Sequence, residues 1–283
     1  MGDLRESATL HKRIMHIVMF LILLLCSVVA VFPFLWMLSS SVKNSTEVFF
    51  YPIDWIPDVI KWSNYTDVLN KFNFGSYFKN TASVSIMITI GTLLVSIMAA
   101  YAFAKLQFRG NNFIFLLYIS TLMLPWQVYM IPQYLIATKM HLIDTHIGLA
   151  LTSIFAPFGV FLLKQFFMGI PNEYSEAAKI DGCTQMGICF RIIVPMSKPA
   201  LTTLVLLTFM SAWNDYLAPL IYLKTERLRT LQIALHYFQG ENETDWALLM
   251  AGASLSMIPV LLLYIFAQKQ LMEGMASAGG IKG

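Results

Sequence analysis

The sequence predicts an all-α membrane protein with six transmembrane helices. Of its 283 residues, 57% are hydrophobic and only 12% are charged, whereas about 25% of the residues in a typical soluble domain are charged. A helix needs roughly 20 apolar residues to cross about 30 Å of hydrocarbon. Because a lipid-exposed backbone must hydrogen-bond within its own segment, apolar stretches near this length predict helices. The six stretches are residues 14–38, 81–104, 113–131, 147–163, 200–223 and 246–267.

The first stretch is predicted to remain in the protein as a span. Lys12 and Arg13 precede it, as basic residues also precede the core of a cleaved signal peptide. Its apolar run of about 25 residues is longer than the roughly 7–15 residues of such a core, and no small-residue cleavage pattern follows it. Residues 1–13 therefore form a short segment before the first span.

The later stretches carry residues that indicate packing or bending. Gly91 and Ser96 in the second stretch are small, which lets helices approach closely. Pro125 and Pro132 bracket the end of the third stretch, and Pro259 lies inside the sixth, so each of these helices is expected to bend or break. The fourth stretch is short, and a polar segment interrupts the fifth.

Polar and aromatic residues in two places are candidates for a solute path. One group follows Pro125, and the other interrupts the fifth stretch, where Asp215 is the only acidic residue in any predicted span. Ionisable residues in spans usually face a bundle interior or a cavity. Helix packing and anchoring at the membrane interface are the alternatives for both groups. The candidate pathway residues are Trp126, Gln127, Gln133, Trp213, Asn214 and Asp215.

The distribution of Lys and Arg predicts that both termini lie in the cytoplasm. If the N-terminus is inside, Lys12 and Arg13 share that side with Lys105 and Arg109, as the positive-inside rule requires. The predicted organisation is an N-terminal cytoplasmic segment 1–13, a membrane domain 14–271 that includes a cytoplasmic segment 171–195, and a cytoplasmic tail 272–283.

Charge and cysteine usage give no support for a nucleic-acid-binding protein, a disulfide-rich protein or a metalloprotein. The net charge of +3 follows from the asymmetry between the membrane faces and gives no reason to expect a nucleic-acid partner. The three cysteines lack CxxC spacing and the five histidines are scattered. Neither a disulfide framework nor a metal site is expected from these patterns.

Residues 176–195 read EAAKIDGCTQMGICFRIIVP and form a polar island between two apolar stretches. Pro171 is predicted in the first turn of a short helix, where its missing N–H is not needed, and Glu176 lies near the positive end of the helix dipole. Gly182 is predicted to end this helix, and a second amphipathic segment runs to Pro195. Two short helices at an angle form a compact docking element. An amphipathic loop on the membrane surface is the alternative.

The island contains, in order, Glu176-Ala177-Ala178, Asp181-Gly182, Ile192 and Pro195. This series resembles the EAA loop of permease subunits in binding-protein-dependent ATP-binding cassette (ABC) importers. Cys183 stands where Ala usually follows the Gly, and Val194 stands where Leu usually precedes the Pro. The resemblance covers most of the chain. Three further motifs resemble the second, maltose-permease-like subunit of the carbohydrate-uptake branch: Trp213-Asn214-Asp215, Thr244-Asp245-Trp246 and Gly279-Gly280-Ile281-Lys282-Gly283.

The resemblance implies a six-helix type I importer permease fold in which the loop docks on a separate ATPase. The implied partners are a cytoplasmic ATPase dimer, a second permease subunit, an extracytoplasmic solute-binding protein and the lipid bilayer of a bacterial cytoplasmic membrane. The implied coupling residues are Glu176, Ala177, Ala178, Asp181, Gly182, Ile192 and Pro195. Residues of the tail that are implied to reach the ATPase are Gly279, Gly280 and Lys282.

The chain contains no GxxxxGK[ST] phosphate loop. ATP and its Mg²⁺ are therefore expected to be used by the partner, and this chain is expected to bind no cofactor or metal and to be no enzyme. The expected solute is an oligosaccharide or a related carbohydrate, with a glycerol phosphate ester as the alternative. A secondary transporter is the alternative class, but it should show internal repeats and several ionisable residues in its spans. This sequence shows no clear repeat, and Asp215 is the only acidic residue in a predicted span. A scaffold that anchors a cytoplasmic enzyme through the same loop is a further alternative.

Overall fold

The computed structural model describes residues 2–71, 73–239 and 244–279, and within these ranges the chain is helical and contains no strand. The all-α prediction is confirmed for these residues. The chain forms two compact units. One comprises Met1–Phe72 and Phe238–Leu255, and the other comprises Asn73–Tyr237 and Ser256–Gly283.

The first unit contains α1 (Gly2–Ser41), η1 (Ser45–Glu47), α2 (Ser63–Lys71) and the start of α14 (Trp246–Gly279). Its part from Arg13 to Ser41 is long and apolar enough to cross a membrane, and it contains the predicted first span. The amide of Asn64 donates to the carbonyl oxygens of Ser41 and Lys43 at 2.9 and 2.8 Å. These hydrogen bonds hold α2 against the end of α1.

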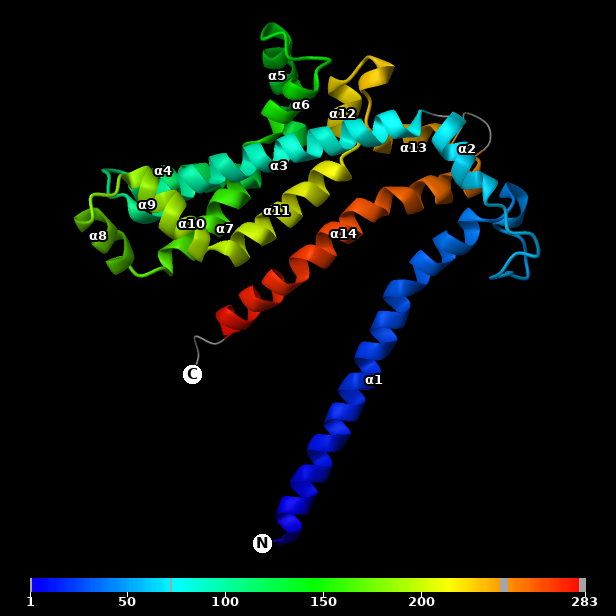
Figure 1. The fold of residues 1–283 in the computed structure, drawn as a ribbon, viewed down its shortest axis with the longest axis horizontal. Helices are drawn as coiled ribbons and strands as arrows, with labels where there is room; N and C mark the ends of the chain where they lie inside the picture. The colour runs from blue at the N-terminus through cyan, green and yellow to red at the C-terminus, as the bar shows by residue number, and fades with distance from the viewer. Residues whose placement is uncertain (1, 72, 240–243, 280–283) are drawn as a thin grey trace. The chain divides into compact units, whose positions relative to one another are not determined.

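The second unit is built around the long helix α3 (Phe74–Lys105), and Figure 1 shows α7 and α11 alongside it. Buried residues of these three helices, including Ile97, Val160, Leu163 and Leu204, form one apolar core. The remaining elements of this unit are α4 (Asn111–Ser120), η2 (Thr121–Met123), α5 (Trp126–Lys139), α6 (His146–Ser153), α7 (Pro157–Met168), α8 (Glu173–Ile180), α9 (Gln185–Ile188), the π-helix η3 (Cys189–Ile193), α10 (Val194–Met196), α11 (Lys198–Trp213), α12 (Leu217–Tyr222), η4 (Glu226–Leu228), α13 (Leu231–Tyr237) and the rest of α14.

Small residues allow α3 to approach its neighbours closely. A Cβ atom added to Gly91 would lie 2.6 Å from the Cγ2 atom of Ile154, and one added to Gly159 would lie 2.7 Å from the Oγ atom of Ser96. Both distances are shorter than van der Waals contact, so a larger residue would push the helices apart. The packing role predicted for Gly91 and Ser96 agrees with these contacts.

The predicted third span is not one straight helix. The helical segments on either side of Leu124 and Pro125 are bent by 103° relative to each other. Pro125 lacks an N–H and disfavours helical backbone in the residue before it, and Leu124 is extended, with φ −90° and ψ 111°. The kink expected at Pro125 is confirmed. Helix α5 continues past the predicted end of the span at residue 131, through Pro132 to Lys139.

The predicted fourth span is broken as well. Helices α6 and α7 are bent by 51° relative to each other. Between them, Ala156 is extended, with φ −115° and ψ 96°, and the next residue, Pro157, begins α7. Proline fits the first position of a helix but disfavours helical backbone before it. The expectation of one helix over residues 147–163 is therefore wrong.

The predicted fifth span, residues 200–223, ends early because α11 stops at Trp213. The side-chain amide of Asn214 donates to the carbonyl oxygen of Met210 at 2.9 Å, and Asp215 Oδ1 accepts from the Ala218 N–H at 3.2 Å. Side chains that bond to nearby backbone in this way compete with continued helix. The single helix expected here is thus two helices, α11 and α12.

Three helices are individually long and apolar enough to cross a membrane, namely the ones over Arg13–Ser41, Phe74–Lys105 and Trp246–Gln270. Three bent pairs pass the same test together, so the described residues contain up to six spans. The third pair joins Gln185–Met196 to α11 across an 84° bend. The sixth predicted span lies within α14, which continues through Pro259 to Gly279. Pro259 therefore does not break this helix.

Asp144 ties the connection between α5 and α6 to the segment after α12. Its carboxylate accepts from the N–H groups of Lys224 and Thr225, both at 2.9 Å, and from the Thr225 hydroxyl. The hydroxyl and then the N–H of Thr225 are the main causes that hold the pKa of Asp144 below its ordinary value. The stability that this carboxylate contributes is therefore present above the ordinary aspartate pKa of about 3.9, and it is lost as the pH falls through the lowered pKa.

Replacing Asp144 with Asn should flatten this acid dependence. At neutral pH the variant is expected to melt about 2 °C or less below the wild type, because exposed charges are well screened by water. The two melting temperatures should converge as the pH is lowered below 4, which thermal unfolding of the purified proteins measures. Parallel pH profiles would show that Asp144 does not stabilise the fold through its charge.

Candidate functional site

The segment 171–195 contains α8, a turn, and a second helical stretch made of α9, the π-helix η3 and the start of α10. Helix α8 ends at Ile180, and Gly182 then takes the left-handed conformation, with φ 79°, which glycine adopts without steric cost. Thr184 caps α9, because its hydroxyl oxygen accepts from the Gly187 N–H at 3.2 Å. The helix end predicted at Gly182 is confirmed.

The start of α8 differs from the prediction. Asn172 is the N-cap, and its carbonyl oxygen accepts from the N–H groups of Ser175 and Glu176 at 2.9 and 3.0 Å. These bonds close the first turn after Asn172, so Pro171 lies just before the helix. The predicted place of Pro171 in the first turn is therefore wrong.

The expected coupling residues divide between the two faces of this segment. Ala178 is buried, and it packs into the apolar core with Ile188 and Ile193. Ile192 is half-buried and packs at the edge of the same core. The exposed members of the set are Glu176, Ala177, Asp181, Gly182 and Pro195. The inner face thus fixes the segment to the unit, and the outer face remains available.

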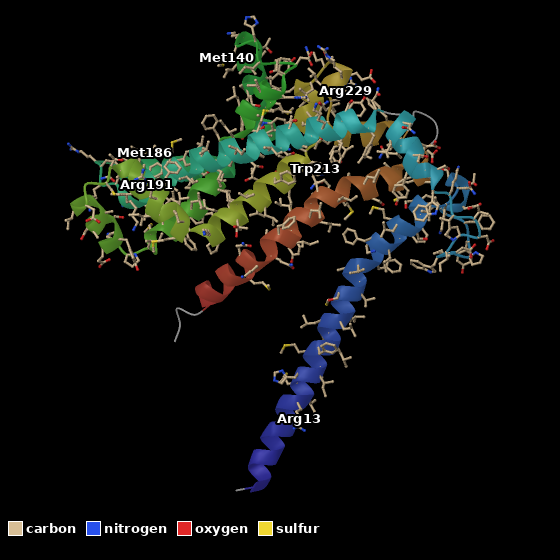
Figure 2. All side chains as sticks on the ribbon, in the orientation of Figure 1. Arg13, Met140, Met186, Arg191, Trp213 and Arg229 are labelled. Carbon is tan, nitrogen blue, oxygen red and sulfur yellow. The ribbon has the colours of Figure 1, made fainter. Side chains whose placement is uncertain are left out.

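The outer face also exposes apolar side chains. Ile180 is 88% exposed, and Met186 and Tyr174 are 56% and 51% exposed. Figure 2 labels Met186 and Arg191 in this region, at the end of α3 where Lys105 lies. Exposed apolar side chains with polar residues around them are typical of a surface that binds a protein or a membrane.

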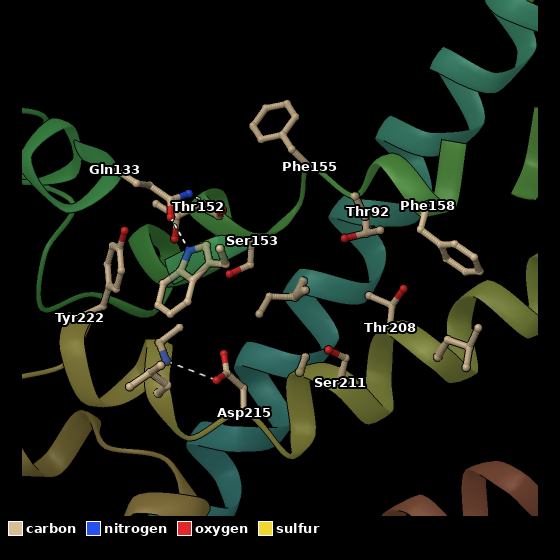
Figure 3. Close-up of a pocket in the computed structure, with 18 of the residues that line it drawn as sticks. Thr92, Gln133, Thr152, Ser153, Phe155, Phe158, Thr208, Ser211, Asp215 and Tyr222 are labelled. Carbon is tan, nitrogen blue, oxygen red and sulfur yellow. Dashed lines mark hydrogen bonds between the residues drawn. The ribbon is translucent and has the colours of Figure 1, made fainter. Parts of the chain in front are cut away.

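The same unit contains a cavity of about 540 Å³, within the usual range of about 300–1,000 Å³ for small-molecule sites. Figure 3 shows hydroxyl, amide and aromatic side chains around this space. Its walls come from α3, α5, the break between α6 and α7, α11 and α12. Lining residues predicted for a solute path are Trp126, Gln127, Gln133 and Asp215.

Hydrogen bonds hold two of these side chains in place. The indole N–H of Trp126 donates to Gln133 Oε1 at 2.8 Å, and the Gln133 amide donates to the Thr152 carbonyl oxygen at 2.8 Å. This chain of bonds links α5 to the end of α6. It fixes the aromatic ring of Trp126 and the amide of Gln133 as parts of one wall.

The other two predicted pathway residues do not line the cavity. Trp213 is only 1% exposed, donates its indole N–H to the Ser256 carbonyl oxygen at 2.9 Å and stacks on Phe209 with ring centroids 5.5 Å apart. Asn214 is exposed and bonds back to α11. Both therefore serve the packing and the end of α11 in this structure.

Sequence reasoning missed the hydroxyl groups of the cavity. Thr208 and Ser211 lie three residues apart on α11, and this spacing puts them on one helix face. That pattern was a usable signal, although hydroxyl residues are also common where transmembrane helices pack. The lining hydroxyl residues that were missed are Thr92, Thr152, Ser153, Thr208 and Ser211.

Two further predictions concern metal and the tail. Within the described residues, no group of three or more His, Cys, Asp and Glu side chains could hold a metal ion. All three cysteines are free. Gly279 is the last residue of α14. Gly280 and Lys282 lie outside the described residues.

Comparison with known proteins identifies similar chains. Residues 91–276 match the family described as "Binding-protein-dependent transport system inner membrane component". The chain is 34% identical over 258 residues to the arabinooligosaccharides transport system permease protein AraQ of Halalkalibacterium halodurans, covering 90% of this chain and 92% of that protein. It is 32% identical over 266 residues to the sn-glycerol-3-phosphate transport system permease protein UgpE of Pectobacterium atrosepticum, covering 91% and 95%.

A solved structure is also similar. It is the crystal structure of a bacterial ABC transporter involved in the import of the acidic polysaccharide alginate. One of its chains superposes with a TM-score of 0.79 at 25% identity, covering 91% of this chain and 96% of that one.

Proposed function

The chain belongs to the family of inner membrane components of binding-protein-dependent transport systems, and on this premise we propose that it is the permease subunit of an ATP-driven importer for a neutral carbohydrate. As a member of this family, the chain is a multi-pass membrane protein and a transport component. The solute, the coupling to an ATPase and the membrane orientation belong to the proposal.

The observation that carries the proposal is that one compact unit holds both a solute-sized cavity and an exposed pair of short helices. We assign the segment 171–195 as the coupling segment, which docks on a partner ATPase through its outer face. Asp181 and Gly182 are exposed on that face, and Glu176 is exposed on the side of α8 that shares a cavity with Tyr101 and Lys105. With both termini in the cytoplasm, the coupling segment lies on the side where an ATPase finds ATP and Mg²⁺.

The remaining partners follow from the same assignment. A second permease subunit completes the pathway, and a solute-binding protein delivers solute to the outer face. ATP binding and hydrolysis in the partner would switch the permease pair between outward-facing and inward-facing states. The absence of a phosphate loop in this sequence supports the assignment of hydrolysis to the partner.

The charge of the cavity favours a neutral solute. None of its lining residues is Lys, Arg or His, and Asp215 is the only charged residue among them. A phosphate ester would meet no cation there, and a negative charge 4 Å from a carboxylate costs about 4 kcal/mol at an effective dielectric constant near 20. The hydroxyls, amides and aromatic rings of the lining suit a sugar, which has polar edges and apolar faces.

The phosphate ester remains the second candidate, because one similar permease is that of an sn-glycerol-3-phosphate transport system. The test is ATP hydrolysis by the complete complex in proteoliposomes with its solute-binding protein. Neutral oligosaccharides, including arabino-oligosaccharides, should stimulate hydrolysis, and sn-glycerol 3-phosphate should not. Stimulation by the phosphate ester alone would support the second candidate, and no response to any carbohydrate would contradict the proposal.

A further inference from the structure

Residues on both sides of α8 are hydrogen-bonded to one face of α3. Before α8, Lys105 Nζ donates to the Ile170 carbonyl oxygen at 2.5 Å and to Asn172 Oδ1 at 2.9 Å. After α8, the Tyr101 hydroxyl donates to Gln185 Oε1 at 2.8 Å. Tyr101 and Lys105 are one helical turn apart, so their side chains lie on the same face of α3. This face therefore holds the residues just before α8 and the first residue of α9.

A polar cavity of about 840 Å³ separates much of α8 from the end of α3. The side chains of Glu176 and Lys179 line it from α8, and Tyr101 and Lys105 line it from α3. On this side of α8 the two elements are therefore not in continuous apolar contact. The three hydrogen bonds of Lys105 and Tyr101 join α3 to residues on either side of α8.

Helix α3 also forms part of the wall of the solute cavity. Ile88 and Thr92 line that cavity, and α3 continues from them as one helix to Lys105. Lys105 lies thirteen residues after Thr92, which corresponds to about 20 Å along the helix at 1.5 Å per residue. Secondary-structure elements of this kind are among the structures that carry coupling between distant sites.

We propose that Lys105 and Tyr101 are positioning residues that transmit movement of the coupling segment to α3, and through α3 to the wall of the solute cavity. This inference rests on the proposed docking of the coupling segment on an ATPase. A hydrogen bond from an ammonium group is about twice as strong as a neutral one. Lys105 therefore holds the segment more firmly than Tyr101, and loss of both side-chain donors leaves only the apolar contacts of Ala178, Ile188 and Ile193 to link the segment to α3.

The experiment compares a double variant, Lys105→Met with Tyr101→Phe, against the wild type in the complete complex. Both changes remove the hydrogen-bond donors and keep most of the side-chain volume. Ser211 is exposed and lines the solute cavity, so Ser211→Cys in each background reports access to the cavity. Labelling of that cysteine by a charged maleimide, resolved by peptide mass spectrometry, is measured with and without Mg-ATP. This readout needs no knowledge of the solute.

With the anchors intact, Mg-ATP should change the labelling rate about fivefold or more, as allosteric couplings usually do. The double variant should still bind the ATPase and hydrolyse ATP, but its labelling rate should change less than about twofold. Lys105→Arg, which keeps donors at this position, should restore part of the response. The matched control is Lys79→Met with Tyr77→Phe, which removes an exposed lysine and a tyrosine hydroxyl at the opposite end of α3. It should respond as the wild type does.

Two results would overturn the inference. An unchanged response to Mg-ATP in the double variant would show that the anchors transmit nothing. Loss of ATPase binding would show that they only shape the docking surface, and the docking assignment itself would survive. Failure of the proposed function would give a different result. In that case the wild-type chain itself would bind no ATPase, and the assignment of the coupling segment would be wrong.

Discussion

Replacement of Gly182 with Asp is expected to leave the chain inserted and folded but to abolish ATPase association and uptake. Gly182 has a left-handed backbone, and a Cβ atom there would meet no atom within 4 Å. Asp and Asn are the residues other than Gly that accept this conformation most readily. The free chain should therefore tolerate the change, and the cost should fall on the docked complex.

The size of this effect follows from desolvation of the new charge. An unpaired charge buried in an interface costs roughly 2–5 kcal/mol, which raises the dissociation constant about 30-fold to several thousand-fold. Copurification of the ATPase with the permease in detergent measures the loss, and membrane fractionation checks insertion.

Gly182→Asn is the matched control, because it has the same shape and backbone preference without the charge. It should weaken ATPase association much less than Gly182→Asp does. Normal uptake by the Asp variant would show that the coupling segment does not dock through this turn. Equal losses in both variants would place the effect in side-chain size and not in charge.

Replacement of Asp215 with Leu is expected to reduce uptake roughly a hundredfold while ATPase association stays normal. Asp215 is the only charged residue in the cavity lining, and its Oδ1 atom also accepts from the Ala218 N–H at the start of α12. Leu removes both the charge and this acceptor. Hydrogen bonds to charged groups contribute about 1.5–3 kcal/mol, which corresponds to roughly 10- to 150-fold in an equilibrium constant.

Asp215→Asn separates the two roles, because its carbonyl oxygen can still accept from Ala218. We expect a loss of about tenfold in uptake, since the acceptor remains and only the charge is lost. The probe is the labelled neutral oligosaccharide that most strongly stimulates ATP hydrolysis by the wild type. Wild-type uptake by both variants would show that Asp215 takes no part in solute transport. Reduced ATPase association would indicate a general folding defect.

The apolar stretches revealed the helices but not where they bend. Hydropathy averaged over a span does not register a single extended residue such as Leu124 or Ala156. Pro125 was a visible signal, because proline acts on its own position and on the residue before it. The polar segment around Asp215 was also a visible signal, but the end of α11 at Trp213 depends on side-chain bonds made by Asn214 and Asp215.

The pathway residues show a similar limit. The sequence marked Trp126, Gln133 and Asp215 as polar or aromatic interruptions, and the fold gathers them at one cavity. It marked Trp213 for the same reason, but the indole packs on Phe209 and is buried. Which face of a helix meets a cavity depends on the neighbouring helices, and residue type alone carries little information about it.

The anchors of the coupling segment could not be predicted from the sequence. Lys105 was used only as a basic residue that orients the span, and Tyr101 lies within an apolar run. Their partners, Asn172 and Gln185, are 67 and 84 residues away in the chain. Such contacts exist only once α3 and the coupling segment are packed together.

We propose that this chain moves a neutral carbohydrate with energy from a partner ATPase. Uptake of a labelled neutral oligosaccharide can be measured in proteoliposomes that contain the complete complex, with the solute-binding protein outside and ATP inside. We expect accumulation that requires both ATP and the binding protein and that is lost with Gly182→Asp. Accumulation driven by a proton or sodium gradient without ATP would contradict it and would identify a secondary transporter.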